Sequence, residues 1–317
     1  MNSDTFFDFC VVGLGQHAQT KLIPAILNNK QNLRGVVSSK NSFNLSIRSQ
    51  IFENLDKACS ELKDDVCFII ATPPKFHFEA VNFLHRQKRN TLVEKPIFTS
   101  VLDAQKFTQF QRCPDFIIGE MFMHKHSRLY QKFLSDWKKH KATTSSIEIG
   151  FTIPSLPQKT FRDSRDLEDS IIFDIGCYPI STISDIGILS DRFSIINSNW
   201  QGGILQNLVL EFKNQMNLKI RIKIGVSESY SNYLFMKTFD GKYFRYGPFY
   251  YGRKGNRVVE TWENNELKKR DIIEENDCFQ NMLGVEKSFW NLGLSDQAIK
   301  TLDCIRVLDA IKSKMTQ

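Results

Sequence analysis

The glycine-rich segment near the start of the chain places the strongest constraint on its fold. An apolar run over residues 6–12 leads directly into the pattern Gly13-x-Gly15-x-x-Ala18. The run predicts a buried strand, and the glycines predict a tight turn into a helix whose first backbone amides point at a phosphate. Gly15 lets a pyrophosphate approach the backbone, and the small Ala18 lets the helix pack closely on the strand. Pro24 predicts a kink or an early break in this helix.

This turn is typical of dinucleotide sites when the surrounding fold is an alternation of strands and helices. Strands are predicted over residues 33–37, 67–71 and 91–94, and helical stretches over 54–62 and 77–87. The alternation predicts a parallel, doubly wound sheet, in which ligands bind at the carboxyl ends of the strands. The residues expected to contact a cofactor follow those ends: Gly13, Gly15, Gln16, His17, Ala18, Thr72, Pro73, His77, Glu94 and Lys95.

Two features of this edge bear on the cofactor. No acidic residue lies between Phe9 and Phe52, although NAD sites usually carry one about 20 residues past the glycines to hold the ribose 2′-hydroxyl. Ser38, Ser39 and Lys40 stand there instead. Because these groups can hydrogen-bond a 2′-phosphate that a carboxylate would repel, we expect NADP in preference to NAD. The alternative is an exposed polar loop that binds either cofactor.

His77 opens the helix predicted over residues 77–87. Two interpretations of its side chain carry similar weight at this point. In one, the imidazole faces the cofactor. In the other, it only lies near the start of the helix.

Sheet signals dominate the second half of the chain. Apolar residues alternate with Lys219, Arg221 and Lys223 over residues 218–224, and Asp240-Gly241 and Asn264-Asn265 indicate hairpins. We expect a large antiparallel sheet with its helices on one face and the three basic residues exposed to solvent on the other. The uncovered face is expected to assemble the protein into a homodimer or homotetramer.

Length and composition exclude several classes of protein. The 317 residues suit two domains, predicted at 1–118 and 119–317. No apolar run approaches the ~20 residues of a membrane helix, and the first residues lack the basic region of a signal peptide. Seven widely spaced cysteines fit the reduced thiols of a cytoplasmic protein. The net charge of +7 is dispersed along the chain, which favours anionic small molecules over nucleic acid as ligands.

His124 and His126 flank Lys125, and such a pair of histidines could indicate a metal site. Alternation on a strand would place both histidines on one side, but no third ligand is near in sequence, so we predict no metal. Lys125 is interpreted as a contact for the substrate or its phosphate.

Together these blocks resemble the glucose–fructose oxidoreductase, inositol dehydrogenase and rhizopine catabolism family, Gfo/Idh/MocA. The resemblance covers residues 6 to 180. Its matching pieces are Gly13-x-Gly15-x-x-Ala18, Ala71-Thr72-Pro73, His77 with Glu79-Ala80-Val81, Glu94-Lys95-Pro96, Glu120-Met121-Phe122-Met123, Phe161-Arg162 and Asp174-Ile175-Gly176-Cys177-Tyr178-Pro179.

The resemblance implies an α/β protein with an N-terminal Rossmann domain and a C-terminal α+β domain built on a large, mostly antiparallel sheet. It implies NAD(P)-dependent oxidation or reduction of a sugar or sugar derivative, including nucleotide-linked ones. It places a catalytic lysine at Lys95, an acid/base residue at Tyr178 and a carboxylate at Asp174. The predicted substrate contacts are Lys125, Arg162, Asp174 and Tyr178.

The chemistry expected from these residues is a reversible hydride transfer coupled to a proton transfer. A tyrosine has a pKa of about 10, and a nearby lysine cation favours the phenolate, so Lys95 can tune Tyr178. Asp174 lies on the same face as Tyr178 if the intervening segment is helical. Two alternatives stay open. One is a non-catalytic dinucleotide sensor of the same fold, and the other is a reductase of a non-sugar imine or linear tetrapyrrole.

Overall fold

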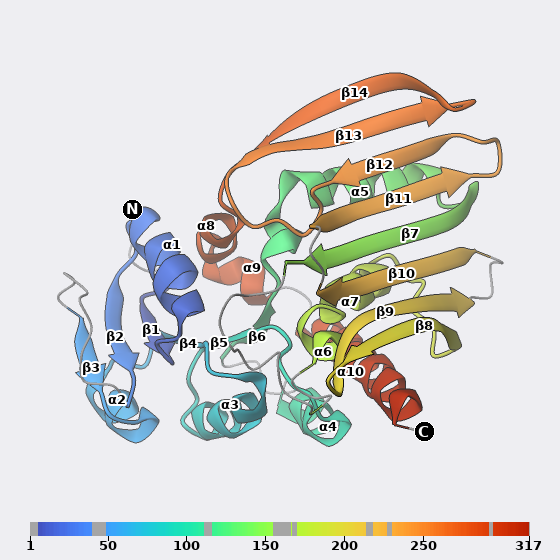
Figure 1. The fold of residues 1–317 in the computed structure, drawn as a ribbon. Coiled ribbons are helices and arrows are strands. Elements are labelled where there is room, and N and C mark those ends of the chain that lie inside the picture. The colour runs from blue at the N-terminus through green and yellow to red at the C-terminus, as the bar shows by residue number, and fades with distance from the viewer. Residues whose placement is uncertain are drawn as a thin grey trace. The chain divides into compact units, whose positions relative to one another are not determined.

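The chain folds into two compact units, and a computed structural model describes most of both. The described residues are 6–39, 49–110, 116–154, 166, 170–213, 218–226, 230–291 and 294–316. The first unit consists of residues 1–122 together with 279–302, and the second of residues 123–278 together with 303–317. Each unit is built around its own sheet (Figure 1).

The sheet of the first unit is parallel throughout. Its strand order is β3-β2-β1-β4-β5-β6, as expected for a doubly wound fold in which helices connect neighbouring strands. Its central strands are buried on both faces, which explains their continuous apolar sequence. The strands are β1 (Phe9–Val12), β2 (Leu33–Val37), β3 (Gln50–Phe52), β4 (Cys67–Ile70), β5 (Thr91–Glu94) and β6 (Ile118–Met121).

The two helices predicted over residues 54–62 and 77–87 are present as α2 and α3, with bounds close to the predicted ones. The Asn54 side chain caps α2 by accepting a hydrogen bond from the Lys57 amide at 2.9 Å. The helix after β1 changes geometry near Pro24 and does not break: a π-helical turn, η1, runs directly into α1, which has Pro24 in its first turn. The bounds are η1 (Ala18–Leu22), α1 (Ile23–Asn28), α2 (Leu55–Glu61), η2 (Pro74–Phe76), α3 (His77–Arg86) and α4 (Val101–Phe110). Helix α4 and strands β3 and β6 have no counterpart among the elements predicted from the sequence.

The expected boundary between residues 118 and 119 does not coincide with the boundary between the units. Residues 118–121 form β6, whose Glu120 lies opposite Val93 of β5, so this strand belongs to the first sheet. Residues 279–302 also return to the first unit. Trp290 in this segment packs against β6: a Cβ atom added to Gly119 would lie only 2.9 Å from the Trp290 ring. This segment contains most of α8 (Cys278–Leu283), α9 (Lys287–Asn291) and the start of α10 (Leu294–Met315).

The second unit contains an eight-stranded sheet that is antiparallel except for the pairing of β7 with β10. Ile220 and Ile222 of β10 lie opposite Ile147 and Ile149 of β7, and all four are buried. The strands are β7 (Thr144–Ile153), β8 (Phe193–Gln201), β9 (Ile204–Lys213), β10 (Lys219–Val226), β11 (Ser231–Thr238), β12 (Tyr243–Gly247), β13 (Gly255–Glu263) and β14 (Glu266–Glu275). Their order is β14-β13-β12-β11-β7-β10-β9-β8.

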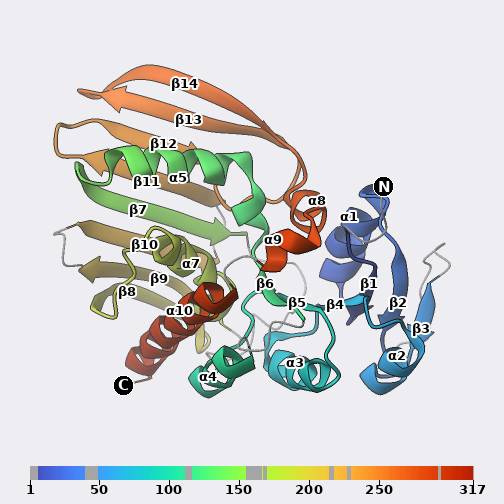
Figure 2. The same cartoon turned by 180° about the vertical axis from the view of Figure 1, so that it is seen from behind.

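Helices cover one face of this sheet, as Figure 2 shows for α5 (Arg128–His140) and α7 (Cys177–Asp185). The alternating basic residues Lys219, Arg221 and Lys223 are exposed on the other face, as predicted. Both predicted hairpins are present, and Asn264 and Asn265 have φ of 53° and 63°, the left-handed values that a two-residue hairpin turn requires. Within the described residues, no helix is both long and apolar enough to cross a membrane.

Candidate active site

The turn after β1 has the two distinct glycine roles that its pattern predicts. Gly13 has φ of +94°, and a Cβ atom there would lie 3.0 Å from the Thr72 Cγ2 atom and 3.1 Å from the carbonyl group of Ala71. The fold itself therefore requires this glycine. Gly15 is exposed, and nothing lies within 4 Å of the position that its Cβ would take. The packing of the protein would therefore tolerate a side chain at position 15. The open space next to Gly15 is suited to a ligand.

The residues around these glycines form an exposed helix start. Gln16 and His17 are exposed, whereas Ala18 is fully buried against the sheet. The amides of the first helical turn have no carbonyl partner within the helix, which makes this end a suitable place for a phosphate. A pyrophosphate group fits the site, because the space above Gly15 is open and the neighbouring side chains are accessible.

The end of β2 lies beside this turn. The Gly13 amide donates to the Val37 carbonyl at 2.9 Å, and the Ser38 amide donates to the Phe52 carbonyl at 3.0 Å. Ser38 is half-buried and Ser39 is exposed, so the Ser39 hydroxyl is accessible to a ligand at this edge. Lys40 lies outside the described residues.

The structure shows which way the His77 side chain faces. Its ring is fully buried, with Nδ1 lying 3.0 Å from the Pro96 carbonyl and 3.2 Å from the Ile97 carbonyl, and Nε2 lying 2.8 Å from the Thr72 carbonyl. Burial lowers the pKa of His77, and the three carbonyl contacts oppose that shift. The imidazole therefore links the loops that follow β4 and β5 and does not reach solvent.

Glu94 and Lys95 follow β5 at the same edge. The Glu94 carboxylate lies 3.0 Å from the His17 Nε2 atom, which joins the end of β5 to the glycine-rich turn. Burial alone would raise the pKa of Glu94, but His17, Lys95 and His77 together hold it below its usual range. Lys95 is half-buried, and its peptide bond to Pro96 is cis.

Parallel pairing brings these groups to one edge. β1, β4 and β5 are adjacent strands, so the carboxyl ends that carry Gly13, Thr72 and Lys95 meet there. The first unit thus gathers Gly13–Ala18, Thr72–His77 and Glu94–Lys95, as predicted from the sequence. The His17–Glu94 contact between two of these groups was not foreseen.

Tyr178 lies in an aromatic cluster within the second unit. Its ring centroid is 5.2 Å from that of His124, 5.3 Å from Phe151 and 5.4 Å from Tyr250. The Tyr178 carbonyl accepts hydrogen bonds of 3.0 Å from both Ser181 and Thr182. The ring is therefore held from several sides by packing, and the backbone beneath it by two hydroxyl groups.

The segment from Asp174 to Tyr178 is not one continuous helix, so the condition for placing both side chains on the same helix face is not met. α6 (Ile171–Asp174) ends at the carboxylate, and α7 begins at Cys177. A Cβ atom on Gly176 would lie 2.3 Å from the Ile172 carbonyl oxygen, so only glycine permits the close approach between these turns. Asp174 and Tyr178 are both buried within this unit, at 7% and 9% exposure.

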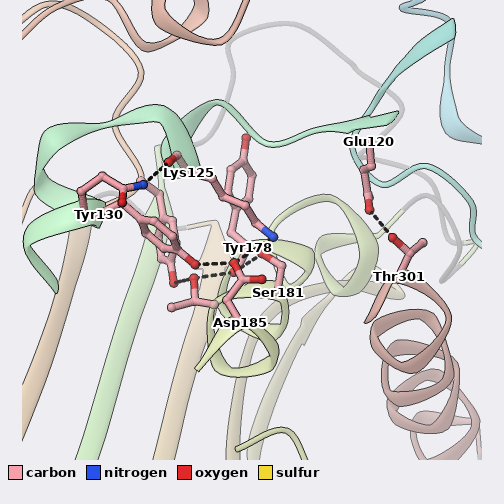
Figure 3. A network of polar contacts seen from close by, with 10 residues as sticks. Glu120, Lys125, Tyr130, Tyr178, Ser181, Asp185 and Thr301 are labelled. Atoms are coloured by element: carbon pink, nitrogen blue, oxygen red, sulfur yellow. Dashed lines mark hydrogen bonds and ion pairs between the residues drawn. The ribbon is translucent and has the colours of Figure 1, made fainter. Parts of the chain in front are cut away.

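Lys125 has a protein partner. Its Nζ lies 2.9 Å from the Asp185 Oδ2 atom, which also accepts a 2.5 Å hydrogen bond from the Tyr130 hydroxyl (Figure 3). Burial and the Asp185 charge raise the pKa of Tyr130 well above its usual value. Asp185 was missed in the sequence, although it lies seven residues after Tyr178 and therefore near the same face of the helix. Arg162 lies outside the described residues.

The two histidines beside Lys125 do not lie on a strand. They belong to a 3₁₀ turn, η3 (Met123–His126), which corrects the strand alternation assumed for them. Burial and the Lys125 charge lower the pKa of His126 to about 4. Within the described residues, no three histidine, cysteine or acidic side chains are grouped as metal ligands would be.

The parallel sheet and the glycine-rich turn are those of a dinucleotide-binding domain, and comparison with known proteins shows which family this domain is similar to. Residues 7–113 match the model of the GFO_IDH_MocA oxidoreductase family with an NAD-binding Rossmann fold. This match confirms, for residues 7–113, the resemblance to the Gfo/Idh/MocA family that was inferred from the motifs.

Similar proteins extend the comparison to the whole chain. The dTDP-3,4-didehydro-2,6-dideoxy-alpha-D-glucose 3-reductase of Actinomadura kijaniata is 28% identical over 121 residues, a match that covers 37% of this chain and 36% of that protein. A 3-ketoreductase from the same organism, crystallised with NADP and TDP-benzene, shares the fold with a TM-score of 0.82 and 17% identity over 97% of each chain. A Gfo/Idh/MocA family oxidoreductase from Vibrio cholerae has a TM-score of 0.72 and 13% identity over 98% of each chain.

A substitution at Gly15 tests the ligand role of the turn. We expect Gly15→Val to weaken NADPH binding by at least about tenfold, because the added side chain occupies the space that the pyrophosphate needs. The melting temperature should stay close to that of the parent, since no atom lies near this position. Fluorescence titration with NADPH and a thermal melt check both expectations.

Gly13→Ala serves as the matched control. It should lower the melting temperature, because its Cβ would meet the β4 loop and its positive φ disfavours a side chain. Unchanged NADPH affinity in Gly15→Val would contradict the assignment of the turn.

Proposed function

We propose that this protein is an NADP-dependent oxidoreductase that reduces the carbonyl group of a nucleotide-linked sugar. The observation that carries the proposal is the set of loops at the edge of β1, β4 and β5, where an open glycine turn and Lys95 meet within the matched family region. Further support comes from the two matches in Actinomadura kijaniata, one named as a 3-reductase of a dTDP-linked deoxy sugar and one as a 3-ketoreductase.

Each residue has a defined task in this reaction. The bound dinucleotide supplies the hydride that is added to the carbonyl carbon. Tyr178 donates the proton that the carbonyl oxygen gains. The carbonyl thus becomes a hydroxyl, with two electrons and one hydrogen from the hydride and one proton from Tyr178. Lys95 binds the same oxygen and favours the phenolate that remains on Tyr178. Asp174 orients the substrate or Lys95.

Crystal structures of the similar 3-ketoreductase include variants of the same two residue types. The 3-ketoreductase was also crystallised as variants in which one lysine or one tyrosine is substituted, each with NADP and TDP-benzene. Those two residues lie at nearly the same separation in sequence as Lys95 and Tyr178. The same pair of residue types is therefore proposed to serve this chain.

Substitution of the two residues tests the proposal. Lys95→Ala and Tyr178→Phe should each lower kcat for reduction of a keto-sugar nucleotide by about 10²- to 10⁴-fold, the usual range for lost acid–base catalysis. The double variant should be little worse than the worse single variant, because the two residues act as a unit. The measurement is the loss of NADPH absorbance, with NADPH binding checked separately.

Tyr250→Phe is the matched control for Tyr178→Phe. It removes a hydroxyl from the same aromatic cluster, where that hydroxyl donates to Thr182 at 3.1 Å, and it leaves the ring in place. We expect its kcat to change by only a few-fold. Near-parental turnover in Tyr178→Phe would refute the acid/base role, and NADPH binding without turnover on any carbonyl substrate would favour a sensor.

The preference for NADP is a separate prediction. Ser38, Ser39 and Lys40 offer hydrogen-bond donors where a carboxylate would select NAD, and the similar ketoreductase was crystallised with NADP. We expect NADPH to bind at least about tenfold more tightly than NADH in calorimetric titration. Ser39→Asp should weaken NADPH binding more than NADH binding, since it sets a carboxylate against the 2′-phosphate. Tighter binding of NADH to the parent protein would refute the preference.

The open face of the eight-stranded sheet is proposed as the surface through which the protein assembles. This face is hollowed, with one depression of about 820 Å³ whose lining includes Glu148, Arg221, Lys223 and Tyr233. Charges of both signs with interspersed aromatic rings suit a contact between identical surfaces. The proposed assembly is a homodimer or homotetramer.

Light scattering at micromolar concentration tests the assembly. The parent protein should have the mass of a dimer or tetramer. Phe235→Glu should shift it toward the monomer, because Phe235 lines two further depressions of this face. A monomeric parent protein would rule out the assembly.

The cysteines support a cytoplasmic setting for this reaction. In the described part of the chain, six of them are not joined in disulfides: Cys10, Cys59, Cys67, Cys177, Cys278 and Cys304. Burial raises the pKa of Cys278 to about 12, so this thiol is unreactive at neutral pH. A thiol titration of the protein purified under anaerobic conditions tests this setting, because disulfide formation would argue for an oxidising compartment.

A further inference from the structure

The loop that carries Lys95 is held by a carboxylate from the neighbouring strand. Glu120 of β6 accepts a 2.9 Å hydrogen bond from the Ile97 amide through Oε1. Its other oxygen, Oε2, accepts a 3.1 Å hydrogen bond from the Thr301 hydroxyl (Figure 3). The carboxylate thus connects the Lys95 loop with α10 inside the first unit.

The same loop is held from its other side by His77. Residues 96 and 97 present three backbone polar groups, since proline has no amide hydrogen. The Ile97 amide donates to Glu120, and the Pro96 and Ile97 carbonyls face His77 Nδ1 at 3.0 and 3.2 Å. Every backbone polar group of these two buried residues therefore contacts one of two side chains.

This arrangement places a strong constraint on Lys95. Irregular backbone that is buried needs hydrogen-bond partners, and here the partners come from two different elements, α3 and β6. The loop has no strand pairing of its own beyond Glu94, whose ladder partner is Met121. The position of the backbone just after Lys95 therefore depends on Glu120 and His77.

We propose that Glu120 is a positioning residue for Lys95, acting through the Ile97 amide. The inference rests on the proposed function, because it assigns Lys95 a task in the reaction. Small displacements of a reacting group are costly: a shift of about 1 Å can lower a rate by about 10²-fold. Glu120 contributes to turnover through the Lys95 backbone, whereas a merely structural carboxylate would contribute only to stability.

Three variants separate these roles. Glu120→Ala removes both hydrogen bonds. Glu120→Gln keeps a carbonyl oxygen for the Ile97 amide and turns an NH₂ group toward the Thr301 hydroxyl, which can accept from it. Thr301→Val removes only the contact with α10 and leaves the contact with Ile97 intact.

The readouts are kcat and KM for a keto-sugar nucleotide, the affinity for NADPH, and hydrogen exchange of the Ile97 amide by mass spectrometry. Glu120→Ala should lower kcat by about 10- to 100-fold with KM and NADPH affinity within about threefold, and the Ile97 amide should exchange faster. Glu120→Gln should restore kcat to within about threefold of the parent value, because it keeps the positioning hydrogen bond. Thr301→Val should lower the melting temperature and leave kcat nearly unchanged.

The outcomes distinguish this inference from the proposed function. Unchanged exchange at Ile97 in Glu120→Ala would overturn the positioning role, as would faster exchange with parental kcat. Equal loss of kcat in Glu120→Gln and Glu120→Ala would also overturn it. If the parent protein reduces no keto-sugar nucleotide, the proposed function fails, while hydrogen exchange still tests whether Glu120 holds the loop.

Discussion

Parallel pairing of β1 with β4, and of β4 with β5, is the constraint on which the first unit depends. Because the three strands run in the same direction, their carboxyl ends reach one edge together, and every chemically distinctive loop leaves from that edge. An antiparallel strand in the middle of this set would have sent one of the loops to the opposite side. The glycine turn, the Thr72 loop and Lys95 are neighbours for this reason, although Gly13 and Lys95 are far apart in sequence.

The loops at this edge are held by polar groups that satisfy one another. His17 contacts the Glu94 carboxylate, His77 contacts three backbone carbonyls, and Glu120 accepts the Ile97 amide. Left unpaired, the buried His77 imidazole would cost roughly 1–3 kcal/mol, and the buried Glu94 carboxylate would cost more. Once paired, these side chains hold loop backbone that, in the described part of the chain, has no hydrogen bonds to a neighbouring strand. The loops can therefore present Gly15 and Lys95 to a ligand without first becoming ordered.

The second unit positions its tyrosine by different means. Rings surround Tyr178, and hydrogen bonds fix the helix that carries it, with Asp185 accepting from Tyr130 and pairing with Lys125. Gly176 makes this possible, because any side chain there would meet the Ile172 carbonyl and force α6 away from α7. The ion pair between Lys125 and Asp185 also bears on the interpretation of Lys125 as a contact for the substrate or its phosphate. An anionic substrate would have to compete with Asp185 for the ammonium group.

Local sequence determined much of this protein. The glycine spacing, the strand–helix alternation and the hairpin dipeptides each act over a few residues, so they predicted the parallel sheet, the antiparallel sheet, the Gly13–Ala18 turn and the loop of Lys95. Tertiary structure alone decided which distant groups meet. No local pattern shows that Trp290 packs against Gly119, that residues 279–302 return to the first unit, or that His17 contacts Glu94. Such contacts depend on how the strands are ordered in a sheet, and that order arises from packing of the whole chain and not from any short segment.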